Sequence, residues 1–62
     1  MAAYRVFFRD NTGLLKSSEE FEAEDAAAAT TKAADLARKL QHDGAATFEV
    51  LQKGRIISEG KI

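Results

Sequence analysis

The stretch EDAAAATTKAADLARKLQ, residues 24–41, decides the fold because it predicts a single alanine-dense helix. Apolar residues recur in it at spacings of three and four, which gathers them on one stripe of a helix. The members of this stripe are Ala26, Ala29, Ala33, Leu36, Ala37 and Leu40. Since most of these side chains are methyl groups, the helix axis can lie close to whatever the stripe covers. Gly44 is expected in the left-handed conformation just past the end of the helix.

One β-hairpin is predicted before the helix. Residues 4–9 alternate strictly between the two faces of a strand. The residues expected to face the helix are Tyr4, Val6 and Phe8. The sequence of residues 10–13 ends in a glycine, which suits the left-handed position of a hairpin loop. The returning strand, residues 14–22, is polar on both faces, which favours an edge strand with a bulge.

A second hairpin is predicted after the helix. Residues 46–51 alternate like the first strand, Lys53-Gly54 suits a tight turn, and residues 55–59 form the returning strand. Ile56 and Ile57 point to opposite faces of that strand. A slip of one residue in its register exchanges them, so the alternation leaves open which of the two faces the helix.

Connection rules convert the element order ββαββ into a sheet. A right-handed crossover through the helix that passes over the first strand places the third strand beside it. We therefore expect an α+β fold in which one helix joins two β-hairpins. Its four-stranded antiparallel sheet has the order 2-1-3-4, with the helix on one face. Residues 1–62 form a single domain of this kind.

Composition argues against several classes of protein. The chain contains no cysteine and one histidine, which leaves no disulfide framework and no thiolate metal site. Nine basic and ten acidic residues are mixed along it, a balance that does not favour nucleic acid or an anionic membrane. No apolar run approaches the ~20 residues of a membrane span, and the first residues do not resemble a signal peptide. We expect a cytoplasmic protein without a metal, a cofactor or a small-molecule substrate.

The face of the sheet that the helix leaves uncovered is the most informative surface. A single helix cannot cover both faces of four strands, so apolar side chains on the second face lack a partner from this chain. An exposed apolar patch on so small a protein is typical of a contact site. The interface candidates on and around this face are Arg5, Phe7, Arg9, Leu14, Glu49, Leu51 and Ile57.

Three uses of the uncovered face remain open. A homodimer can form through the face itself or through an edge strand, such as the last strand of the chain. A different protein can occupy the same face. Alternatively, the long arms of Arg5, Arg9 and Lys16 shield the apolar residues, and the face has no partner.

The sequence offers little chemistry for catalysis, and we expect no enzyme. The carboxylates gather around the predicted start of the helix and His42 lies near its end, where each charge complements the helix dipole. The alternative to a protein-interaction module is a weak nucleic-acid-binding domain. In that interpretation Phe7 stacks on a base while Arg5 and Arg9 contact phosphates.

Packing and turn residues over positions 21–56 resemble those of small bacterial ββαββ domains of unknown function. The shared features are Phe21 and Ala23 before Asp25, the alanine-spaced helix, and the turn Gly54-Arg55-Ile56. This resemblance implies the fold and a bacterial source, and it transfers no functional residue. The first hairpin and the helix are also similar to HicB-like antitoxin domains, which implies an antitoxin-like role with a protein partner.

Overall fold

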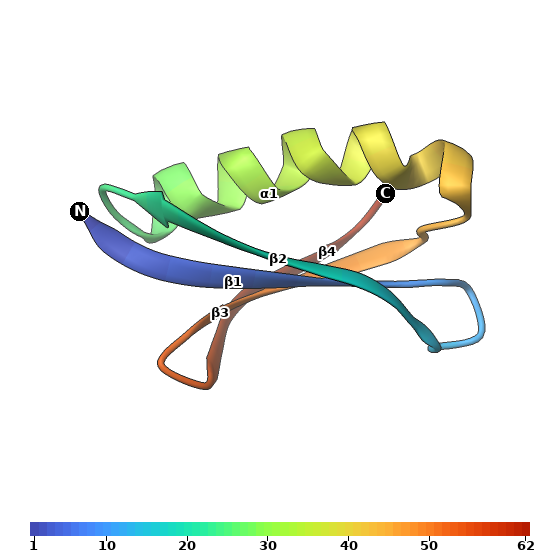
Figure 1. Cartoon of the computed structure of the whole chain (residues 1–62), viewed down its shortest axis with the longest axis horizontal. Coiled ribbons are helices and arrows are strands. Elements are labelled where there is room, and N and C mark those ends of the chain that lie inside the picture. Colours follow the sequence, from blue (N-terminus) through green and yellow to red (C-terminus); the bar gives the residue numbers. More distant parts are fainter.

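The computed structural model describes residues 1–62 and shows a four-stranded sheet with one helix (Figure 1). The elements are β1 (Ala2–Arg9), β2 (Leu15–Ala23), α1 (Ala26–Leu40), the short 3-10 helix η1 (Gln41–Asp43), β3 (Thr47–Gln52) and β4 (Arg55–Lys61). All neighbouring strands are antiparallel, and their order is β2-β1-β3-β4. The helix lies along one face of the sheet, and no element covers the other face (Figure 1). The predicted ββαββ fold and strand order are confirmed.

The core lies between α1 and the two central strands. Its buried residues are Tyr4, Val6, Phe8, Ala23, Ala29, Ala33, Ala37, Ala45, Phe48 and Val50. Three of the alanines lie on successive turns of α1 and are at most 2% exposed. Because their side chains are so short, the helix packs directly on the large side chains of β1 and β3. Ala26, expected in the same stripe, is exposed, since the chain has only just left β2 at this first turn.

Local interactions set the two ends of the helix. The side chain of Asp25 accepts a hydrogen bond of 2.8 Å from the backbone N–H of Ala28 and caps the helix. The helix therefore begins at Ala26, two residues after the predicted start at residue 24, and ends at Leu40, one residue before the predicted end. At the other end, α1 continues into η1, which ends at Gly44 with a φ of 93°. This left-handed conformation is the one predicted for Gly44, because it disfavours any residue with a β-carbon.

Both hairpin turns use backbone conformations that the sequence indicates. Gly13 has a φ of 90°, and Lys53 and Gly54 have φ values of 53° and 81°. Two consecutive positive φ values are those of a type I′ turn, whose twist matches that of the strands it connects. Lysine is an unusual residue at the first of these positions, where asparagine or glycine is favoured.

One irregularity in each hairpin changes which side chains face the helix. The register between β1 and β2 shifts after Phe8, which is the bulge predicted for the second strand. The register between β3 and β4 also shifts, so that Leu51 lies opposite Ile56 while Val50 lies opposite Ser58. The interface prediction for Ile57 is therefore corrected. Ile57 packs against the core, and Ile56 takes its place on the uncovered face with 54% of its surface exposed.

Gly60 brings the backbone of β4 against an aromatic ring of the core. It lies opposite Phe48, and a β-carbon added at Gly60 would lie 3.0 Å from two ring carbons of that residue. This is closer than about nine in ten real β-carbon contacts, so the ring would have to move by a few tenths of an ångström to admit a methyl group. Phe48 is part of the buried core, so a shift of its ring would disturb the packing around it. Packing therefore favours glycine at position 60.

We expect Gly60→Ala to lower the free energy of unfolding by about 1–3 kcal/mol, the usual cost of excess volume in a packed core. Equilibrium unfolding in urea would measure this difference. Ser58→Ala is the matched control, because Ser58 lies on the same face of β4 and opposite Val50. If Gly60→Ala were as stable as the control, the close approach of Phe48 would not be the reason for the glycine.

Candidate functional site

The surface of interest is the face of the sheet turned away from α1, which we call the open face. Residues that pair across an antiparallel sheet point to the same face, so the register gives its composition. Its rows across the strands are Glu20, Arg5, Leu51 and Ile56, then Ser18, Phe7, Glu49 and Glu59, and finally Leu15, Arg9, Thr47 and Lys61. All the residues of β1 and β3 predicted for this face lie on it.

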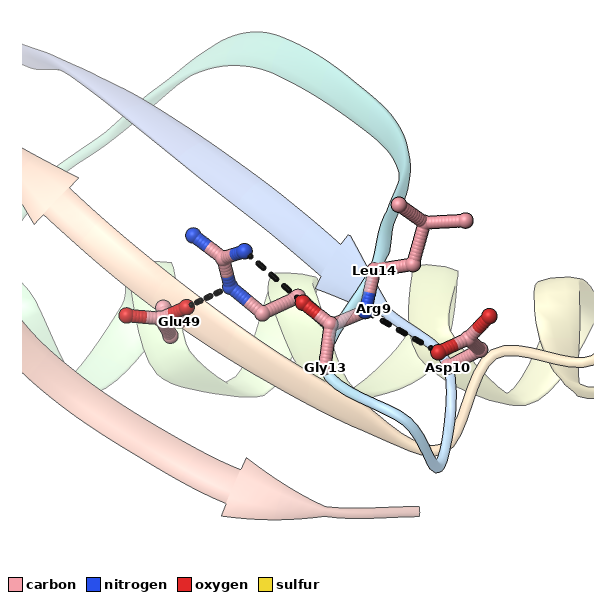
Figure 2. Close-up of polar contacts among 5 residues, drawn as sticks. All are labelled: Arg9, Asp10, Gly13, Leu14 and Glu49. Carbon is pink, nitrogen blue, oxygen red and sulfur yellow. Dashed lines mark hydrogen bonds and ion pairs between the residues drawn. The ribbon is translucent and has the colours of Figure 1, made fainter.

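Each arginine of the open face has a carboxylate partner from a neighbouring strand. Arg5 binds Glu20 of β2 at 2.7 Å, and Arg9 binds Glu49 of β3 at 2.6 Å. Figure 2 shows that Arg9 also donates a hydrogen bond of 3.1 Å to the carbonyl oxygen of Gly13. The Arg5–Glu20 pair is exposed, and such pairs contribute about 1 kcal/mol or less to stability, whereas the Arg9–Glu49 pair is partly buried. Their larger effect here is to neutralise the charge of both guanidinium groups.

An apolar strip crosses the open face between these two ion pairs. Phe7 and Leu51 are half-buried, and Ile56 at the edge is exposed. The arms of Arg5 and Arg9 flank Phe7 along β1 and cover part of it. Lys16 does not contribute to this cover, because the end of its side chain lies beside Gly44, near the end of η1. The prediction that Lys16 shields the apolar residues is therefore wrong.

The strip opens into a hollow of about 550 Å³ at the start of β1. It forms because β1 pairs with β3 only from Arg5 to Arg9, while β1 itself begins at Ala2. Next to residues 2–4 of β1 there is no β3 residue to pair with, because β3 has already passed into the β3–β4 turn. This leaves space beside the start of β1. The residues around the hollow are Ala2, Ala3, Tyr4, Arg5, Phe7, Glu20, Leu51, Gln52, Lys53 and Gly54.

Two exposed leucines lie at the turn of the β1–β2 hairpin, at the end away from the hollow. Leu14 is 66% exposed and Leu15 is 48% exposed. Leu15 lies opposite Arg9 and thus on the open face, whereas Leu14 is in the loop. The side chain of Leu14 points away from Arg9 and Glu49 (Figure 2). Sequence reasoning singled out Leu14, missed Leu15, and left the choice between Ile56 and Ile57 open while naming Ile57 as the interface candidate. The positions of Leu15 and Ile56 both depend on a bulge.

Asp10 holds the loop that presents these leucines. Its carboxylate accepts hydrogen bonds from the hydroxyl and the backbone N–H of Thr12, at 2.6 and 2.9 Å, and from the N–H of Leu14 at 3.0 Å. The Leu14 contact is drawn in Figure 2. The hydroxyl of Thr12 is the main cause that lowers the pKa of the Asp10 carboxyl below its ordinary value. The backbone N–H groups and the charge of Lys16 act in the same direction.

Comparisons with known proteins return no relative. No family model, no curated protein and no solved structure matches this chain. The resemblances to small bacterial domains and to HicB-like antitoxins therefore stay predictions. In the structure itself, no helix has both the length and the apolar character needed to cross a membrane.

Asp10→Ala should destabilise the protein in a way that depends on pH. A carboxyl with a lowered pKa stabilises the fold above the pKa it has in the unfolded chain, and that contribution is lost as the pH falls through the folded-state value. The stability difference between wild type and Asp10→Ala should therefore be full at neutral pH and shrink below about pH 4. Thermal unfolding between about pH 7 and pH 2 would measure it. Asp43→Ala, whose side chain accepts no hydrogen bond, should show no such trend.

Proposed function

We propose that this protein is a non-enzymatic self-association module whose open face docks on the open face of a second copy. The observation that supports this most directly is the arrangement of a hollow and the exposed Leu15 at opposite ends of one face. A surface that carries both parts can be complementary to itself, as a two-fold symmetric interface requires. A partner protein of different sequence would not need both on the same chain.

The spacing of the two ends suits a two-fold axis that crosses the strands. From Ala3 at the hollow to Arg9 beside Leu15 the strand advances six residues, roughly 20 Å at ~3.3 Å per residue. This axis lies between the two faces and runs perpendicular to the strands, so rotation by 180° about it reverses the strand direction. Each Leu15 is then brought to the hollow of the other copy, and the contact is made twice.

The same axis places Phe7 near the centre of the contact. Phe7 lies between the hollow and Leu15 along β1, so the two copies of this residue meet close to the axis. Aromatic residues at the centre of an interface contribute a large share of its binding energy. Pairing of the two faces also gives each sheet a second apolar layer, as in a β-sandwich, where stacked sheets lie about 10 Å apart.

Charge on the open face supports this occupant. Arg5 and Arg9 are each paired with a glutamate, so the apolar strip is flanked by neutral pairs. The charges next to the centre of the face are thus neutralised, while the unpaired Glu59 and Lys61 lie at its β4 margin. The alternative function, nucleic-acid binding through Phe7 and the two arginines, is less well supported because both arginines already bind carboxylates of their own chain.

We expect Phe7→Glu and Leu15→Glu to weaken self-association at least 100-fold, because each buries a carboxylate in an apolar contact. Light scattering over a range of protein concentrations would give the mass, and circular dichroism would show that the variants fold. Thr31→Glu, on the exposed surface of α1, is the control and should leave association unchanged. A wild-type protein that stays monomeric at all concentrations would overturn the proposal.

Salt dependence separates the two functions. Association through Phe7 and Leu15 should persist at about 1 M salt, where the Debye length is only ~3 Å. Binding of a single-stranded oligonucleotide should be undetectable at the same protein concentrations. If an oligonucleotide instead bound at low salt, and Arg5→Ala with Arg9→Ala abolished that binding, the nucleic-acid function would be the correct one.

A further inference from the structure

A second surface, separate from the open face, is the outer edge of β4. β4 is the last strand of the sheet, so one side of its backbone has no partner. The N–H of Ile62 bonds to the carbonyl oxygen of Ala46 at 2.9 Å, which makes Lys61 and Thr47 a pair without mutual hydrogen bonds. By the alternation of an antiparallel ladder, Gly60 and Ser58 direct their backbone groups toward β3, whereas Lys61 and Glu59 direct theirs outward.

The side chains of these two outward residues also lack partners. Glu59 and Lys61 are both exposed, and neither takes part in an ion pair within the chain. Glu59 lies directly opposite Glu49, whose carboxylate is already bound to Arg9. Like charges directly opposite one another destabilise a sheet. A cation placed beside Glu59 from outside the chain would relieve this repulsion.

We infer that β4 pairs antiparallel with β4 of a second copy, with the two Gly60 residues facing each other on the two-fold axis. In this register Glu59 lies opposite Lys61 of the second copy, and the contact occurs twice. The outward N–H and C=O groups of these residues then form main-chain hydrogen bonds across the axis. The two sheets join into one of eight strands, and the two open faces lie side by side.

Other registers of the same strand are less favourable. A pairing centred on Ser58 places Arg55 opposite Lys61, and one centred on Glu59 places the two glutamates opposite each other. At the centre of the proposed register the backbones approach most closely, since pairs without mutual hydrogen bonds have Cα atoms about 4.5 Å apart. Gly60 has no side chain to oppose that approach.

The other free edge of the sheet is protected from the same event. β2 carries Glu19, Glu20 and Glu22 within four residues, against one lysine. Two such strands brought together would set acidic residues beside acidic residues, which is a common way in which proteins block edge pairing. The difference between the two edges points to β4 as the one that pairs. The side chains of Glu59 and Lys61 lie at the margin of the open face, but the main-chain hydrogen bonds of this contact lie along the outer edge of β4, so the inference does not rest on the proposed function.

Charge exchange tests the inference, in the Phe7→Glu background so that contacts through the open face are removed. Glu59→Lys and Lys61→Glu should each weaken the self-association of the Phe7→Glu parent at least tenfold, because each replaces both attractive pairs by repulsive ones. The double variant should associate like its parent. A mixture of the two single variants should form a heterodimer, since lysines of one chain then face glutamates of the other. Sedimentation velocity would measure the parent, the two single variants, the double variant and the mixture.

Amide hydrogen exchange gives a second measurement that needs no substitution. As the protein concentration rises, the N–H groups of Glu59 and Lys61 should become protected by at least tenfold, whereas those of Ser58 and Gly60 are already protected within the chain. The inference is overturned if the single variants associate as their parent does, if their mixture is no tighter than either alone, or if the parent is monomeric and the two amides stay unprotected. A partial loss of association on Phe7→Glu concerns the open face, and the charge-exchange variants are then compared with the association that remains.

Discussion

The close contact between the alanine stripe of α1 and the central strands is the constraint on which the rest of the structure depends. Ala29, Ala33 and Ala37 are almost fully buried and add little volume, so the bulk of the core comes from Val6, Phe8 and their neighbours on the sheet. A helix is about 10 Å wide with its side chains, and four strands extend over roughly 15 Å. One helix held so closely can complete one face only, and the open face follows from that geometry.

The open face combines the charged residues of a protein surface with the apolar residues of a protein interior. Both of its arginines are paired within the chain, Arg5 with Glu20 and Arg9 with Glu49, which suits contact with another apolar layer. Phe7 and Leu51 are only half-buried, so the pairs do not close over them. A small chain gains little from its own core, and association is one of the ways in which domains of this size become stable.

Most of the fold could be predicted because the features that specify it are local, such as alternation along a strand, or topological, such as the handedness of the crossover. The alternation of β1 predicts Tyr4, Val6 and Phe8 in the core, and the handedness of the crossover predicts β3 beside β1. The candidate surface was predictable to the same extent, since its central residues follow from the same alternation. Bulges limit how reliably side chains can be assigned to one face of the sheet from the sequence. A bulge inserts a residue that no pattern of hydrophobicity marks, and it exchanges the faces of every residue beyond it. That is why Ile57 was assigned to the wrong face and Leu15 was overlooked. The two ion pairs of the open face were also out of reach, because they depend on the exact alignment of three strands.

The topology has a consequence for the order of events in folding. Each hairpin pairs residues that are close in sequence, whereas β1 and β3 bring together residues such as Arg9 and Glu49, which are 40 positions apart. Closure of the longer loop costs more chain entropy, so the joining of two preformed hairpins is the expected slow step. Until it occurs, β1 and β3 are both free edges with apolar side chains exposed. At high protein concentration a hairpin of one molecule then competes with the same hairpin of another, and exchange of hairpins between chains is the misfolding route to which this architecture is most exposed.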